Sequence, residues 1–309
     1  MNMLDGSMLT QAEFTLLHFD LRLTEEIDID MALLLRLRRS LRAAASYLFA
    51  ATARPRFNAL FAPPLASDPV ARRQFQKGAP AFVFHHQHLT PGRRRRGERF
   101  TLSAVVFGGD AERVRDLARV VQALGDIGLH QNRGRFALVA VRGEDSAGND
   151  TLLWRSGQSW DEMMPVVRDC GWWLGNRPAV AGDVRLSFVT PARLVHQGRP
   201  LFRSTVHTVV PFILRRVTSM LYTHCYVDLS AAAVSARAAV ARLRQGDNSL
   251  HWHDWRQLHG DETQPLGGLV GSVVICGAAL EELLPWLHLG SLMNIGKNAA
   301  WGAGCYRID

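Results

Sequence analysis

The order of its hydrophobic patterns constrains this chain most, because one β-α-β-β-α-β series occurs twice along 309 residues. In the first half, the spacing predicts strands at 13–23, 81–87, 99–107 and 135–142, and helices at 30–51 and 110–124. In the second half, it predicts a strand at 183–195, helices at 204–225, 229–244 and 278–288, and strands at 249–256, 269–276 and 301–308. The second series therefore contains one extra helix.

The segments between these elements suggest where the domains end. Asp30 is expected to cap the first helix, and the proline-rich stretch 55–69 is expected to be a loop. We expect an α+β protein with an N-terminal domain at 1–145, a linker or insertion at 146–182 and a C-terminal domain at 183–309 with a glycine-rich loop. Within the insertion, the pattern of 151–173 is ambiguous and is consistent with a strand followed by a short helix.

Both halves carry an Ile-Gly pair followed by five residues and a glycine, at 127–134 and at 295–302. The equal spacing between the second helix and the last strand suggests an internal duplication. Glycine-rich loops can turn successive N–H groups toward phosphate, so Gly296 and Gly302 are expected to approach RNA. Lys297 adds charge and Trp301 a stacking face. The alternative is a plain turn whose glycines are needed for tight packing.

The charge balance favours a polyanionic partner. The net charge is +8 with a sequence pI near 10.0, and all basic residues except Lys77 and Lys297 are arginine. Arginine forks onto phosphate and stacks on exposed bases. Solubility alone is the alternative explanation. The expected RNA-binding arginines are Arg93, Arg94, Arg95 and Arg96, in a turn expected at 90–97, and Arg215 and Arg216 on a helix. The alternative is a disordered, solvated hairpin tip for the first four and a solvated helix face for the last two.

Metal and membrane chemistry find little support in the sequence. The segments His85-His86-x-His88 and His251-x-His253 lack accompanying carboxylates or cysteines at ligand spacing, and the four cysteines form no CxxC pair. We therefore expect no metal, no cofactor and no disulfide framework. No signal peptide and no long apolar run is present, so we expect a cytoplasmic protein with no membrane partner.

Several segments, in order, resemble the CRISPR-associated RAMP superfamily, specifically its endoribonucleases that process precursor CRISPR RNA. The similar segments cover most of the chain: RPRFNALFAP at 54–63, APAFVF at 79–84, GERFTLSAVVFG at 97–108, GLHQNRGRFAL at 128–138, FVTPARLVHQG at 188–198, DW at 254–255, LGGLVG at 266–271 and IGKNAAWGAGCYRI at 295–308. Trp301 stands where the family more often has phenylalanine. Each motif is weak alone, and their order and spacing carry the resemblance.

The resemblance implies tandem ferredoxin-like (RRM-like) βαββαβ domains and a role in antiviral defence. It also implies metal-independent cleavage of a CRISPR repeat RNA, in which the RNA's own 2′-OH attacks phosphorus and leaves a 2′,3′-cyclic phosphate. The implied partners are the repeat stem-loop, the mature guide RNA and other CRISPR effector subunits. His130 and Arg133 lie in the first glycine turn and are expected to contact this RNA.

The chain departs from the family in its first helix, which lacks the histidine and the glycine-rich start that many members have. We expect Arg38 and Arg39 to stabilise the charge that develops on phosphate, and His18 to act as general base. Tyr47 is a second choice for the base. The alternatives are a packed strand histidine for His18 and a core position for Tyr47. A non-catalytic RAMP subunit that binds guide RNA remains the alternative function.

Overall fold

The computed structural model describes residues 4, 6–49, 53–64, 78–87, 89–130, 132–145, 147–177, 182–254 and 267–309. It divides into two compact units, an N-terminal unit of residues 13–168 and a C-terminal unit of residues 1–12 and 169–309. Residues 150–155 of the expected insertion form a strand of the first unit, and residues 170–175 form a helix of the second. The expected domain boundaries stay a prediction.

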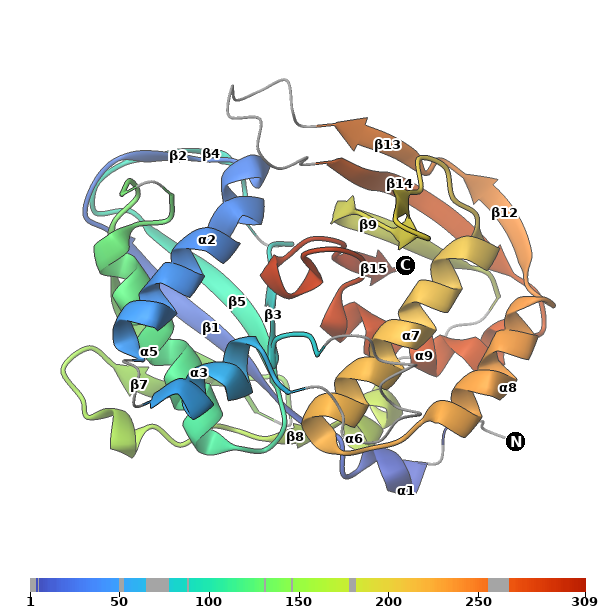
Figure 1. Cartoon of the computed structure of the whole chain (residues 1–309), viewed down its shortest axis with the longest axis horizontal. Helices are drawn as coiled ribbons and strands as arrows, with labels where there is room; N and C mark the ends of the chain where they lie inside the picture. The colour runs from blue at the N-terminus through green and yellow to red at the C-terminus, as the bar shows by residue number, and fades with distance from the viewer. Residues whose placement is uncertain are drawn as a thin grey trace. The chain divides into compact units, whose positions relative to one another are not determined.

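The N-terminal unit is one antiparallel sheet with helices on one face (Figure 1). Its strand order is β3-β5-β1-β6-β7, so the first four strands have the ferredoxin-like order. The strands are β1 (Glu13–Leu23), β3 (Phe82–His85), β5 (Arg99–Phe107), β6 (Phe136–Glu144) and β7 (Asp150–Arg155), and the two-residue β8 (Arg168–Asp169) also pairs with β1. The helices are α2 (Met31–Leu48), α3 (Arg54–Phe61) and α5 (Ala111–Ile127).

Strand β1 shows how the sequence divides this sheet into a core face and an open face. Leu17, Phe19 and Leu21 are fully buried, whereas His18 and Asp20 between them are only partly buried. This alternation follows from the period of two along a strand. The open face is therefore polar, and α2 and α5 pack together on the opposite face.

Two local expectations for this unit are tested by the structure. Asp30 caps α2, because its carboxylate accepts a 2.6 Å hydrogen bond from Leu33 N, as expected. The expected loop at 55–69 is wrong over α3. Proline fits the first turn of a helix, where its missing N–H has no partner to lose, and Phe57 and Phe61 are buried. Residues 65–77 lie outside the described chain.

The C-terminal unit repeats the topology. Its sheet has the order β12-β14-β9-β15, with β13 also paired to β14. The strands are β9 (Val184–Ala192), β12 (Arg244–Asn248), β13 (His251–Asp254), β14 (Gly267–Cys276) and β15 (Tyr306–Ile308). The long helices are α7 (Val206–Cys225), α8 (Ser230–Val240) and α9 (Leu280–Met293). The short elements of this unit are α1 (Gly6–Leu9), α6 (Cys170–Gly175) and the 3-10 turn η4 (Ala299–Trp301), and a further 3-10 turn, η2 (Trp160–Glu162), belongs to the N-terminal unit. The expected α+β tandem ferredoxin-like fold is confirmed.

Two small two-stranded sheets complete the fold. In the N-terminal unit β2 (Ile27–Ile29) pairs with β4 (Gly92–Arg94), and in the C-terminal unit β10 (Val195–His196) pairs with β11 (Arg199–Pro200). The residues expected as a simple turn at 90–97 therefore include a strand. Strand β12 was also not expected, because all five of its residues are exposed and none has an apolar side chain, so the segment shows no alternation of apolar and polar residues.

The two glycine turns have equivalent places in the fold but not the equivalence that the sequence suggested. Leu129 N donates to Gly134 O in the first turn, and Ile295 N donates to Gly304 O in the second. The last strands β6 and β15 each begin two residues later. The structural counterpart of Gly134 is thus Gly304 rather than Gly302. The second turn is four residues longer, since Gly304 follows Ile295 by nine residues whereas Gly134 follows Leu129 by five.

Two further glycines, which precede these turns in the sequence, lie in helices. Gly125 is in α5 and Gly290 is in α9. A Cβ on Gly125 would overlap the carbonyl oxygen of Phe136, and a Cβ on Gly290 would overlap the Tyr306 hydroxyl. Both glycines therefore allow the first residue of the last strand to pack against a helix. Tyr306 uses this space to donate a 2.6 Å hydrogen bond to Leu287 O.

Candidate RNA-contact and catalytic residues

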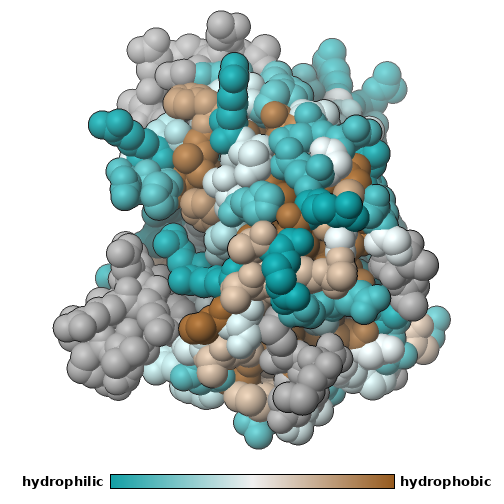
Figure 2. All heavy atoms as spheres, turned by 90° about the vertical axis from the view of Figure 1, so that its right-hand side faces the viewer, coloured by the Kyte–Doolittle hydropathy of each residue, from teal (hydrophilic) through white to brown (hydrophobic). Residues whose placement is uncertain are grey.

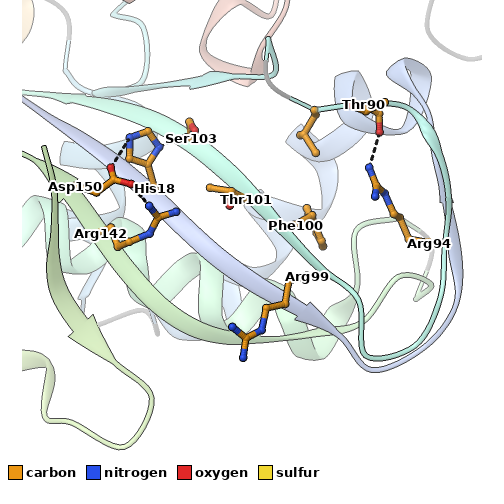
Figure 3. A pocket seen from close by; sticks show the side chains of 10 residues that line it. His18, Thr90, Arg94, Arg99, Phe100, Thr101, Ser103, Arg142 and Asp150 are labelled. Atoms are coloured by element: carbon orange, nitrogen blue, oxygen red, sulfur yellow. Dashed lines mark hydrogen bonds and ion pairs between the residues drawn. The ribbon is translucent and has the colours of Figure 1, made fainter. Parts of the chain in front are cut away.

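A polar groove of about 370 Å³ lies on the open face of the N-terminal sheet (Figure 3). The strand register forms it, because β1 places His18 beside Ser103 of β5 and beside Arg142 of β6. Figure 3 shows His18, Ser103, Arg142 and Asp150 close together, with Arg94 at the far end of the groove. The lining residues are His18, Leu89, Thr90, Arg94, Arg99, Phe100, Thr101, Ser103, Arg142 and Asp150.

His18 is held at this groove by one hydrogen bond and one longer ion-pair contact. Its Nδ1 shares a 2.9 Å hydrogen bond with Ser103 Oγ, and its Nε2 lies 3.9 Å from Asp150 Oδ1. Burial lowers the pKa of His18 below its usual value, and this effect outweighs the opposite effect of Asp150. The imidazole is therefore neutral at pH 7 and can accept a proton.

Arg142 beside it is occupied by carboxylates. Its Nε and Nη2 donate to the two oxygens of Asp20 at 2.8 Å each, and its Nη1 pairs with Asp150. Burial raises the pKa of Asp20, but the hydrogen bonds from Arg142 and Thr101 outweigh it and lower the pKa overall. Bidentate pairing of this kind neutralises the guanidinium. The groove floor is thus an ion-pair network rather than a free cationic surface.

Arg38, Arg39 and Tyr47 lie on α2, and the structure does not bring them together with His18. All three side chains are exposed, Tyr47 by 84%, so the core alternative for Tyr47 is wrong. Helix α2 covers the buried face of the sheet, whereas His18 lies on the open face. Within this unit a sheet separates the expected base from the expected arginines.

The four-arginine run is partly paired within the unit. Arg93 of β4 donates to Glu26 at 2.5 Å, and Arg94 donates to Thr90 O at 3.0 Å. Arg95 and Arg96 are exposed in the turn that leads into β5. The ordered β2–β4 pairing differs from the solvated hairpin tip that was the alternative.

The first glycine turn presents its cation to solvent. His130 and Arg133 form an isolated antiparallel bridge, and Arg133 is exposed. Gly128 ends α5 with a φ of 92°, and a Cβ there would lie 2.5 Å from the carbonyl oxygen of Arg133. The glycine is therefore required by the tightness of this turn.

The second glycine turn uses most of its N–H groups internally. Gly304 N donates to Pro191 O, Lys297 N to Arg193 O and Gly302 N to Ala299 O. Trp301 is only 4% exposed and so packs in the core instead of offering a ring face to a base. Gly302 is also buried, and its carbonyl accepts a 2.7 Å hydrogen bond from Thr190 Oγ1. Lys297 is exposed, and Gly296 is partly exposed beside it.

The arginine pair of α7 divides into one exposed and one interior residue. Arg215 is exposed and lies 5.7 Å from the Phe212 ring centroid. Arg216 donates through Nε to Met293 O at 3.1 Å, and burial lowers its pKa to about 10. Arg216 therefore supports the end of α9, and only Arg215 presents a surface charge.

Metal and membrane features were searched over the described part of the chain. No group of three or more His, Cys, Asp or Glu side chains that could hold a metal occurs among these residues. His88 lies outside them. The four cysteines are free thiols, and no described helix is long and apolar enough to cross a membrane.

Sequence reasoning missed the partners of His18, namely Ser103, Arg142 and Asp150. Alternating polar residues within β1 and β5 were a usable signal for an open polar face. The pairing of β6 with β7, which places Asp150 beside His18, depends on register and has no sequence signature.

Comparison with known proteins finds a family similarity in each half of the chain. Residues 186–306 match the family described as CRISPR-associated endoribonuclease Cas6, and residues 48–165 match a second family described only as an N-terminal domain. No curated protein matches the chain. The expected kinship with CRISPR RNA-processing endoribonucleases is confirmed.

Solved structures share the fold at low sequence identity. A partial Cas6-RT-Cas1–Cas2 complex has a TM-score of 0.56 at 13% identity, covering 96% of this chain and 46% of that one. A product complex of Cas6 from Thermus thermophilus has a TM-score of 0.52 at 15% identity, covering 96% of this chain and 100% of that one. The chain thus spans less than half of the first of these proteins. Residues 186–306 are thus similar to the CRISPR-associated Cas6 endoribonuclease family, and the whole chain shares the tandem fold of these solved structures.

Proposed function

We propose that the chain binds precursor CRISPR RNA and cleaves it within the repeat without a metal, by attack of the 2′-OH on the adjacent phosphorus. The products are a 2′,3′-cyclic phosphate and a 5′-OH. The observation that carries this proposal is the family match over residues 186–306, which spans almost the whole C-terminal sheet and its glycine turn. The expected partners are the repeat stem-loop, the mature guide RNA and other CRISPR effector subunits.

The reaction requires three contributions from the protein. The 2′-oxygen must lie in line with the leaving oxygen, a base must accept its proton, and cations must stabilise the charge that develops on phosphorus. Arg38 and Arg39 are proposed for the charge, because α2 carries four arginines and no carboxylate. Tyr47 lies eight residues beyond Arg39, about 12 Å along the same helix.

His18 is the alternative centre. It is neutral at pH 7 and has Nε2 free of any short hydrogen bond, which suits a general base. Its neighbours Asp20 and Asp150 are carboxylates, however, and would repel a phosphate unless Arg94 or Arg99 at the groove edge offsets them. A single scissile phosphate cannot touch both the His18 groove and α2 of one unit, since the sheet lies between them.

The first experiment tests the activity itself. End-labelled repeat RNA is incubated with the full chain in excess EDTA, and the product ends are analysed. We expect one cut, with a 3′-terminal phosphate that phosphatase removes only after the cyclic phosphate has been opened. Cleavage that EDTA abolishes, or a product with a 3′-OH, would contradict the proposed chemistry.

The second experiment decides between the two centres. Single-turnover cleavage is measured for His18→Ala, for Arg38→Ala with Arg39→Ala, and for Tyr47→Phe. Loss of a positioned base or of charge stabilisation costs about 10²- to 10⁴-fold in rate. We expect that fall for the α2 double variant and less than about threefold for His18→Ala. The reverse result moves the reaction to the sheet groove, and unchanged rates in all three would remove both assignments.

One observation favours a second function. The structure separates the only histidine proposed as base from the proposed arginines, so His18, Arg38 and Arg39 do not form one catalytic set among the described residues of the N-terminal unit. A non-catalytic subunit that holds guide RNA needs no such set. Tight binding of repeat RNA with no cut at any pH between 6 and 9 would support this function instead.

A further inference from the structure

A second pocket lies in the C-terminal unit, between α7 and α8 and beside the β10 hairpin strand. Its volume is about 530 Å³, which falls in the range of small-ligand sites. The lining residues combine four basic side chains with an apolar floor: His196, His207, Pro211, Phe212, Arg215, Arg237, Val240 and Ala241.

Helical spacing explains how these side chains converge. His207, Pro211 and Arg215 are four residues apart on α7 and so form one stripe along the helix. Arg237 and Val240 are three apart on α8 and form the facing stripe. His196 approaches from the β10–β11 hairpin. Two helix faces and a hairpin thus contribute to one pocket.

The sequence around the pocket is almost free of negative charge. Residues 184–246 contain nine arginines and a single carboxylate, Asp228. No ion pair joins Arg215 or Arg237 to a carboxylate among the residues that the structure describes. Figure 2 faces the side that carries α8 and β12, where hydrophilic side chains stand among small hydrophobic patches. The pocket is therefore complementary to an anion.

The floor of the pocket points to more than a bare phosphate. The Phe212 ring lies partly exposed with the Arg215 guanidinium 5.7 Å from its centroid, and Pro211 and Val240 extend the apolar surface. His207 Nε2 lies 3.2 Å from Leu243 O and donates to it, because a carbonyl can only accept. This bond leaves Nδ1 available to a ligand. An aromatic ring beside cations is what a base with its phosphate requires.

We infer that this pocket binds one nucleotide of a single-stranded RNA segment, with the base over Phe212 and its phosphate between Arg215 and Arg237. The inference rests on the proposed function for the identity of RNA as the ligand. It extends the RNA contact expected of Arg215 to a binding pocket on the helical face of the C-terminal unit, outside the glycine turns and outside α2. RNA that flanks the repeat stem is the segment that such a site would hold.

The test compares two RNAs and two variants of the full chain. One RNA is the repeat stem-loop with a single-stranded flank, and the other is the same stem-loop without it. Arg237→Gln is expected to weaken binding of the flanked RNA about five- to tenfold and to leave the unflanked RNA within about twofold. Ala238→Glu is the matched control: it lies next to Arg237 on exposed α8, outside the pocket, and changes the net charge by the same amount. It should have less than half the effect.

A second variant tests the base contact. Phe212→Leu keeps an apolar side chain but removes the ring, and should weaken binding of the flanked RNA about fivefold, because stacking on an aromatic ring contributes to affinity for single strands. Thermal unfolding of each variant confirms that the unit is intact. Equal effects of Arg237→Gln and Ala238→Glu would overturn the inference, since general charge would then explain both.

Two further outcomes separate the possible failures. If the wild-type chain binds neither RNA, the proposed function fails together with this inference. If it binds both RNAs and the pocket variants change nothing, only the inference fails. If a free mononucleotide at submillimolar concentration occupies the pocket without displacing flanked RNA, the ligand is a free nucleotide and the RNA inference is overturned.

Discussion

The two units share one topology but use their arginines in opposite ways. In the N-terminal unit Arg56 pairs with Asp116 and Glu112, Arg119 pairs with the same two carboxylates, and Arg142 pairs with Asp20 and Asp150. Among the described residues of the C-terminal unit, Arg242 pairs with Glu282, whereas no ion pair joins Arg215 or Arg237 to a carboxylate. We therefore expect a nucleic-acid surface where arginines lack nearby carboxylates, rather than where arginines are most numerous.

The glycine turns differ in a similar way. In the first, Gly134 lies beside the side chains of Ile27 and Leu129. In the second, Gly304 lies against the backbone of Ile295, and the longer loop packs Trp301 into the core. The second turn is thus a structural element of the C-terminal unit, and its exposed surface is limited to residues near Lys297.

The largest predicted effect separates these two turns. Gly304→Ala should lower the free energy of unfolding by about 3 kcal/mol or more, because the new Cβ would overlap a backbone oxygen at a φ of 66°. Gly134→Ala should cost about 1–2 kcal/mol, since its φ of 73° is also strained but the nearest atoms belong to side chains that can move. Urea denaturation of both variants gives the comparison. Equal losses would show that the two turns are equally rigid.

The next effect concerns the paired arginines. Arg56→Gln should lower the free energy of unfolding by about 1–3 kcal/mol, because Asp116 is only 5% exposed at its side chain and would lose its strongest partner. Affinity for repeat RNA should stay within about twofold, since this guanidinium is already neutralised. Chemical denaturation and RNA filter binding on the same preparation measure both. A loss of RNA affinity without a loss of stability would contradict the distinction between paired and unpaired arginines.

A smaller effect is expected from pH in the C-terminal unit. Burial, with a smaller contribution from the charge of Arg177, lowers the pKa of His288 to about 4. The folded protein then binds this proton less readily than the unfolded chain, whose value is 6.5, so stability falls as pH decreases from 6.5 to 4. The expected loss is about 1–2 kcal/mol after allowance for solvent screening. In His288→Gln the stability should change less over this range, and an unchanged pH profile would show that His288 is solvated.

The smallest effect is at the exposed tip of the second turn. Lys297→Ala should weaken repeat-RNA binding about three- to fivefold and reduce the slope of log Kd against log salt by about 0.7–0.9, the contribution of one phosphate contact. Arg133→Ala in the first turn is the matched variant, because both side chains are exposed. Similar effects would indicate that both turns contact RNA. An unchanged salt slope for Lys297→Ala would remove this lysine from the RNA surface.

Much of the secondary structure was predictable, because its determinants are local. β1 and β5 occupy the expected residues 13–23 and 99–107, where alternation along a strand is clear. Helix α3 was missed because a proline was interpreted as a break, and β12 because an exposed edge strand has no hydrophobic period. The candidate site was less predictable: His18 was found, but its partners come from three other strands.

The sequence by itself determined the order of most elements, the tandem fold class and an arginine-rich, basic composition, since these depend on period, capping and residue type. The tertiary structure alone decided which residues meet. Strand alternation and sheet pairing placed His18 on the face opposite Arg38 and Arg39, and turn length made Gly304 the counterpart of Gly134. Helix packing brought Arg215 and Arg237 to one pocket. Such contacts depend on register and on the face that each element buries, which a sequence pattern specifies one element at a time.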